Sequence, residues 1–250
     1  MANYDNQSAR YGTSVARGAE GAIDQGLRAH MLRVYNYMAV GLVLTGVTAW
    51  AVANVPALTN LFFTQTAAGG LGMTGLGWVA FIAPIALVFV LSFGVQRLSV
   101  GTAQLVFWGY AALMGISLAT IFFAYTMTSI TQVFFVTAAT FGAMSLWGYT
   151  TKRDLTGIGS FLFMGLIGIV IASIVNIFIG STALGFAISI IGVLVFTGLT
   201  AYDTQKIKEM YYVGDDGTVA GRKAIMGALS LYLDFINLFL MLLRLFGDRR

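Results

Sequence analysis

The sequence predicts an all-α polytopic membrane protein, and three observations support that fold class. Of the 250 residues, 58% are hydrophobic and 10% are charged, whereas a soluble domain carries roughly a quarter charged residues. Three stretches contain no Asp, Glu, Lys or Arg: residues 34–96, 98–151 and 155–202. Each stretch is long enough for two membrane-spanning helices of about 20 residues with an uncharged turn between them.

The apolar runs predict seven transmembrane helices in one bundle. We expect them at residues 34–54, 78–96, 103–125, 131–150, 158–179, 183–204 and 225–246. Pro84 lies inside the second span and should kink it, which membrane helices tolerate when a neighbour satisfies the carbonyl that the proline frees. Residues 1–30 are polar and lack apolar periodicity, so we expect a disordered cytoplasmic N-terminus before a single seven-helix transmembrane domain over residues 31–250.

The basic residues predict the orientation of the bundle. Arginines precede the first span and Lys or Arg residues follow the second, fourth and sixth spans, whereas the three opposite loops carry no charge. Basic loops stay in the cytoplasm, so this alternation places the N-terminus there. If the last segment crosses fully, Arg244 finishes on the outer side; a re-entrant segment is the alternative, and the length favours a full crossing.

Composition excludes several classes of function. The chain has no Cys and a single histidine, His30, so disulfides, Cys-based metal sites and His-based catalytic triads are not expected. The net charge of +4 is spread beside the apolar segments without a dense basic patch, so we expect the lipid bilayer and no nucleic acid as partner. We also expect no resident cofactor.

Two carboxylates stand within or beside apolar spans. Asp203 lies in LTAYDTQKIKEMYY and Asp234 lies in SLYLDFINLFLMLLRLFG. A charge at the bilayer centre costs about 2.5–3.5 kcal/mol on insertion scales, so each acid needs a partner. On a helix, Asp234 belongs to one semi-polar stripe with residues at spacings of three or four, which we expect to face the bundle interior: Ser230, Asn237, Met241 and Arg244.

The two aspartates are candidates for a proton-sharing pair. The sixth and seventh spans run antiparallel, and a helical continuation of the sixth through Lys208 would bring Asp203 toward the depth of Asp234. Two negative charges a few ångströms apart in a low dielectric cannot both persist, so such a pair shares a proton and titrates as one unit. Its deprotonation would create repulsion, affinity for a cation such as Ca²⁺, or both. Arg97, after the second span, is the candidate counter-ion of a pH-sensitive latch.

Simpler roles remain open for each of these residues. Asp203 fits an interfacial cap or a partner of the nearby lysines, and Asp234 fits a structural hydrogen bond. Arg97 fits a charge that only sets topology, and Asn176 in the fifth span fits a helix–helix hydrogen bond.

Three sequence motifs resemble those of a known family. AYDTQKI at 201–207 and GALSLYLDFINLFLMLLRLFG at 227–247 resemble the signature of the Bax-inhibitor family, also called the transmembrane Bax inhibitor motif family. MGISLATIF at 114–122 resembles the third span of that family. The resemblance covers about residues 30–247 and is closest to the bacterial branch.

The resemblance implies a fold and a function. Family members have seven helices, with the last one central and surrounded by the other six, and bacterial members are described as pH-sensitive calcium leak channels of the cytoplasmic (inner) membrane. The pH-sensing aspartates of the family correspond to Asp203 and Asp234, and the latch arginine corresponds to Arg97. Some relatives carry a glutamate in the second span, but residues 78–96 contain no acid, which puts a calcium site built there in doubt.

Two other functions are alternatives to a channel. Other bacterial relatives are linked to control of a membrane-bound protease, a regulatory role that would use the N-terminus and the 205–224 loop without ion flux. An intramembrane aspartyl protease is disfavoured because its GxGD motif is missing: YVGD at 212–215 has Tyr in place of the first Gly. We therefore expect a protein that is not an enzyme and whose ligands are calcium ions and protons.

Overall fold

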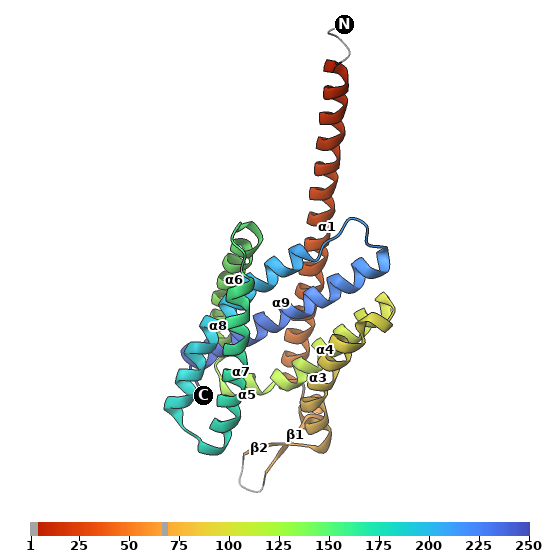
Figure 1. The fold of residues 1–250 in the computed structure, drawn as a ribbon. Helices are drawn as coiled ribbons and strands as arrows, with labels where there is room; N and C mark the ends of the chain where they lie inside the picture. Colours follow the sequence, from red (N-terminus) through yellow and green to blue (C-terminus); the bar gives the residue numbers. More distant parts are fainter. Residues whose placement is uncertain (1–4, 67–69) are drawn as a thin grey trace.

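The computed structural model describes the backbone of residues 5–66 and 70–250, and it describes side-chain surroundings from residue 25 onward. Figure 1 shows a helical bundle with one short antiparallel hairpin, in which Phe63 lies opposite Met73. In chain order the elements are α1 (Asp5–Asn54), α2 (Pro56–Phe62), β1 (Phe63–Gln65), β2 (Leu71–Met73), α3 (Gly75–Gly94), the 3-10 turn η1 (Val95–Arg97), α4 (Val100–Leu118), α5 (Thr120–Ala124), α6 (Met127–Thr150), α7 (Thr156–Ile179), α8 (Thr182–Glu209) and α9 (Gly217–Phe246).

Within the described ranges, seven helical segments are long and apolar enough to cross a bilayer, which confirms the predicted number. They are α1 from Gln25 onward, α3 with η1, α4 with α5, and each of α6, α7, α8 and α9. The first and last spans begin earlier than predicted, at Gln25 and Gly217, because the helices continue beyond their apolar stretches. The chain is therefore an all-α polytopic membrane protein. A boundary between a disordered segment (1–30) and the domain (31–250) stays a prediction.

The last helix lies at the centre of the bundle. In its most apolar stretch 72% of the residues are buried, against 6% to 33% in the other six spans. Figure 1 shows α9 crossing the bundle diagonally, and it packs mainly against α1, α4, α6 and α8. Helix α3 packs against α4, and α7 packs against α8, so these two form an outer layer. The implied ring of six helices around the last one is thereby refined to four close neighbours and two outer helices.

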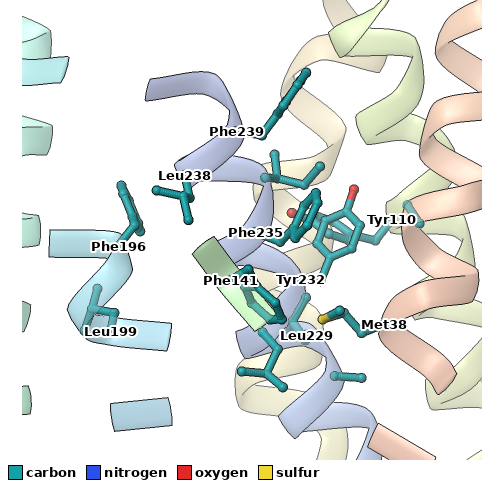
Figure 2. Close-up of a cluster of buried hydrophobic side chains, with 14 of the residues drawn as sticks. Met38, Tyr110, Phe141, Phe196, Leu199, Leu229, Tyr232, Phe235, Leu238 and Phe239 are labelled. Carbon is teal, nitrogen blue, oxygen red and sulfur yellow. The ribbon is translucent and has the colours of Figure 1, made fainter. Parts of the chain in front are cut away.

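Aromatic side chains of α9 fill the core. Tyr232 is 0% exposed and Phe235 is 4% exposed. Figure 2 shows Phe141 of α6 and Tyr110 of α4 beside them. The ring centroids of Phe141 and Phe235 lie 5.5 Å apart, edge to face, and those of Tyr110 and Tyr232 are also 5.5 Å apart. Because such pairs contribute about 0.5–1.5 kcal/mol beyond the burial of their area, they stabilise one rotation of α9 relative to α4 and α6.

Both ends of α9 are attached to neighbouring segments. At the end of the bundle that holds the η1–α4, α6–α7 and α8–α9 connections, here called the basic end, Arg222 Nε donates to Leu98 O at 2.8 Å. At the other end, here called the opposite end, Asp248 N donates to Ser129 Oγ at 3.0 Å. A helix of 30 residues is about 45 Å long, more than the hydrocarbon core of roughly 30 Å. Helix α9 is therefore long enough for the predicted full crossing, and whether it crosses or re-enters stays a prediction.

Pro84 lies within α3, which is helical from Gly75 to Gly94. Proline has no N–H, so the carbonyl of Ala80, four residues earlier, loses its usual helical donor. The Oγ of Ser117 on α4 lies 3.3 Å from Ala80 O and 3.1 Å from Leu113 O of its own helix, so its single hydrogen can serve either carbonyl. A neighbouring helix thus offers a donor within reach of the freed carbonyl, and this contact lies where α3 packs on α4.

Candidate functional site

Asp203 and Asp234 face each other where α8 packs on α9. Helix α8 continues to Glu209, as the predicted extension through Lys208 requires. The two carboxyl groups lie within hydrogen-bonding reach of each other. Because carboxylates are acceptors, this contact is a hydrogen bond only when one of the two groups carries a proton. Asp234 is 4% exposed, and its Oδ2 has no other donor among the described residues.

Glycines on both sides of the aspartates allow α8 and α9 to approach closely. A Cβ at Gly227 of α9 would lie 3.2 Å from the Ile207 side chain of α8. A Cβ at Gly192 of α8 would lie 2.8 Å from Met241 of α9. Small residues at such contacts allow helix backbones to come together in lipid, where van der Waals packing replaces the hydrophobic effect. These two contacts fix the separation of the helices that carry the aspartates.

The aspartates open onto a cavity between α7, α8 and α9. Its volume is about 850 Å³. Most of the semi-polar stripe of α9 lines it, and Asn237 Nδ2 donates to Leu233 O at 2.8 Å within that helix. The polar lining residues are Ser160, Ser173, Tyr202, Asp203, Lys206, Ser230, Asp234 and Asn237. The structure therefore brings Ser230 and Asn237 to the same cavity as the two aspartates.

Lys206 is the one basic side chain among the described residues that line this cavity. It is exposed, and its Nζ lies 5.8 Å from the centroid of the Tyr202 ring. Its positive charge acts on Asp203, one helical turn before it. Sequence reasoning treated this lysine only as an alternative partner of Asp203. Its spacing of three residues from that acid was the signal that could have placed it in the site.

Arg97 does not reach the aspartates in this structure. It ends η1 at the basic end, and its side chain is exposed. The next residue, Leu98, accepts the bond from Arg222 near the start of α9, and Asp234 lies twelve residues further along that helix, about 18 Å away along the axis. Among the described residues the only ion pair joins Lys223 and Asp215. A latch role of Arg97 stays a prediction about a conformation other than this one.

The two aspartates do not form a calcium cage by themselves. Ca²⁺ takes six to eight oxygen ligands, and the described part of the chain has no group of three or more His, Cys, Asp or Glu residues placed to hold a metal. The carboxylates, with the nearby oxygens of Ser230 and Asn237, can offer a passing ion only a partial coordination shell. A calcium contact at Asp203 and Asp234 therefore stays a prediction.

A second cavity follows at the opposite end of the bundle. It has a volume of about 940 Å³ and shares Ser173 and Ile177 with the first cavity. Arg244, the last member of the stripe, lines this second cavity and not the one with the aspartates. Asn176 also lies here: its Oδ1 accepts from Ser181 N at 3.1 Å in the turn between α7 and α8, so its bond is to the turn and not across two spans.

Known proteins are similar to this chain over most of its length. Residues 27–250 match the model of a family described as inhibitor of apoptosis-promoting Bax1. The inner membrane protein YbhL of Escherichia coli (strain K12) is 53% identical over 227 residues, which are 90% of this chain and 94% of that protein. Protein RP147 of Rickettsia prowazekii (strain Madrid E) is 52% identical over 229 residues, or 91% and 92% of the two chains. A protein of Borreliella burgdorferi is 43% identical over 222 residues, or 88% and 92%.

Proposed function

This chain belongs to the Bax-inhibitor family, in its bacterial branch, and from that membership and its buried aspartate pair we propose that it is a pH-regulated, calcium-permeable leak pathway of the inner membrane. One observation carries the proposal: two carboxyl groups within hydrogen-bonding reach, one of them 4% exposed, border a cavity between membrane-spanning helices. Ca²⁺ is the permeant ion in this proposal and not a resident cofactor.

The proposed regulation follows from the charge of the pair. With one shared proton, the two carboxyl groups attract each other and hold α8 against α9. Without that proton, two unit charges 4 Å apart repel by about 4 kcal/mol at an effective dielectric constant of 20. The same negative charge attracts a cation into the cavity, where Lys206 is the competing cation. Flux therefore rises with pH as the shared proton is lost.

The remaining parts of the proposal concern orientation and the closed state. The N-terminus lies in the cytoplasm, because the basic connections follow the second, fourth and sixth spans. The basic end then faces the cytoplasm, and the second cavity faces the outer side. Arg97 serves as the latch counter-ion only in a conformation in which it leaves its exposed position. In this proposal the protein catalyses no chemical reaction.

A regulatory role is the second candidate, and the α8–α9 connection favours it. Tyr212 is 67% exposed and Val213 is 63% exposed in that connection. Exposed apolar side chains at the bilayer surface suit contact with another membrane protein. A membrane-bound protease is the proposed partner, and this role needs no ion flux.

Calcium influx into proteoliposomes loaded with a calcium-sensitive dye tests the channel. Wild type, Asp234→Asn and the control Asp154→Asn, which changes an exposed loop aspartate, are compared from acidic to alkaline pH. Because one shared proton titrates about tenfold per pH unit below its midpoint, we expect wild-type and control flux to rise by up to about tenfold per unit. Asp234→Asn should lose this pH response.

Two results would contradict the proposal. Flux no greater than that of empty liposomes at every pH, with folded protein inserted, would exclude the channel and favour the regulatory role. A pH response in Asp234→Asn equal to that of the wild type would retain a leak but remove the aspartate pair from its regulation.

A further inference from the structure

The cavity at the opposite end carries a charge pattern that a cation pathway does not explain. It lies between the end of α7, the start of α8 and the C-terminal segment, with a volume of about 940 Å³. Arg244 and Arg249 line it, and its described lining contains no Asp or Glu. Two positive charges at the mouth of a pathway repel cations and concentrate anions. The chemistry of this cavity is therefore that of a site for an anion.

The nearby carboxylate of the C-terminal segment does not neutralise these arginines. Asp248 is held on α6, where Ser129 Oγ donates to its Oδ2 at 3.2 Å and accepts from its backbone N–H at 3.0 Å. Asp248 does not line the cavity, and neither arginine forms an ion pair with any residue that the structure describes. The guanidinium of Arg249 is exposed and lies 5.9 Å from the Tyr125 ring centroid, a cation–π contact that uses none of its N–H donors. Both guanidinium groups thus keep their donors for a ligand.

Neutral donors line the rest of the cavity. Gly180 ends α7 with φ +67°, a left-handed conformation that glycine adopts without strain, and the chain turns there directly into α8. Asn176 uses its Oδ1 to accept from Ser181 N in this turn. Its Nδ2 is left as a donor, and the hydroxyls of Ser181 and Thr182 also border the cavity. The lining therefore offers donors from both sides and few acceptors.

We propose that this cavity binds a phosphate group, supplied either by free inorganic phosphate or by the headgroup of an anionic phospholipid. A guanidinium donates two parallel hydrogen bonds to phosphate and stays charged at all physiological pH values. The amide and hydroxyl groups donate to the remaining phosphate oxygens. A carboxylate ligand has two oxygens only and would leave some of these donors without an acceptor. This site requires no calcium flux and does not rest on the channel proposal.

Thermal unfolding of the full chain in nanodiscs tests this site. Protein in phosphatidylcholine nanodiscs is titrated with sodium phosphate against sodium chloride at equal ionic strength, and the unfolding midpoint is followed by tryptophan fluorescence. A second series replaces part of the phosphatidylcholine with phosphatidylglycerol and contains no phosphate. A ligand that binds the folded state raises the midpoint by mass action. A rise in the first series identifies free phosphate as the ligand, and a rise in the second alone identifies the lipid headgroup.

Matched variants locate the site. The double variant Arg244→Gln with Arg249→Gln removes both charges, and Arg250→Gln removes a neighbouring arginine that does not line this cavity. The probe that raises the wild-type midpoint, sodium phosphate or phosphatidylglycerol, should bind the double variant at least about tenfold more weakly, because charge-assisted hydrogen bonds are lost. Arg250→Gln should bind this probe as the wild type does.

Two outcomes would overturn the site. One is an unchanged midpoint with both probes, and the other is an equal rise in the wild type and the double variant. Should the double variant not fold, the two single variants and Asn176→Ala provide the same comparison with Arg250→Gln.

Discussion

Helices α7 and α9 both cross the bundle, yet they lie in contrasting surroundings. Helix α7 is the more apolar of the two, but 6% of its apolar stretch is buried, against 72% for α9. Helix α7 packs mainly on α8, whereas α9 packs on four helices. Apolar character therefore decides that a helix enters the membrane, but it does not decide which helix lies in the middle.

Polar side chains account for the central position of α9. Lipid tails are as apolar as Leu or Phe, so an apolar helix gains little by leaving them. Asp234 and Asn237 need protein partners within the membrane, and Tyr232 bonds to Thr45 Oγ1 at 2.7 Å. Helix α7 has no acidic or basic residue and makes its few polar contacts near its ends and in the cavity wall.

The largest expected difference between the two helices comes from truncating one phenylalanine on each. Phe235 of α9 is 4% exposed and Phe178 of α7 is 85% exposed. Because a buried Phe leaves a cavity when truncated, Phe235→Ala should lower the free energy of unfolding by about 3–5 kcal/mol, and Phe178→Ala should leave it nearly unchanged. Denaturant titration in detergent micelles measures both. Equal losses would show that α7 is as closely packed as α9.

A smaller effect tests where α7 is attached. A Cβ at Gly159 would overlap the ring of Tyr202 on α8, whereas a Cβ at Gly168 would meet nothing within 4 Å. Gly159→Ala should therefore cost about 1–3 kcal/mol of stability because Tyr202 must shift, and Gly168→Ala should cost nothing. The same unfolding titration gives both values. A loss of stability at Gly168 and none at Gly159 would contradict this packing, because it would mean that α7 contacts α8 through the face that carries Gly168.

The smallest effect concerns the loop that starts α7. Hydrogen bonds from the side chain and the backbone N–H of Thr156 lower the pKa of Asp154, which is fully exposed. A lowered pKa stabilises the folded state above the usual Asp value of about 3.9, and this stabilisation disappears as pH falls through the lowered pKa. The unfolding midpoint of Asp154→Ala should therefore be slightly below that of the wild type at neutral pH. The two midpoints should converge in strong acid. A difference that grows in acid would mean that the pKa of Asp154 is raised and not lowered.

The sequence predicted the helices and placed the aspartates where they could meet, because both depend on regularities along the chain. Charge-free lengths give the spans, and the stripe at Ser230, Asp234 and Asn237 follows from helical periodicity. The antiparallel order of α8 and α9 then limits where Asp203 can lie. These features need no knowledge of how one helix is rotated against another.

The parts that sequence reasoning left open or missed depend on such rotations and on which helices are neighbours. Arg97 was linked to the aspartates by its place at the end of a span, but η1 meets the start of α9, far from Asp234. Gly159 and Gly168 look equivalent in the sequence, and only the packed structure shows which one faces α8. The cavity with Arg244 and Arg249 joins residues from three separate segments.

The two attachments of α9 have a mechanical consequence. Arg222 donates to Leu98 O at one end of α9, and Asp248 N donates to Ser129 Oγ just beyond the other end. Sliding of α9 along its axis would break both hydrogen bonds. An increase in the distance between Asp203 and Asp234 then costs less when α8 moves than when α9 slides. Since α7 packs on α8, the two helices would move together as one rigid pair relative to α9. The cavity that they line with α9 would then change its width.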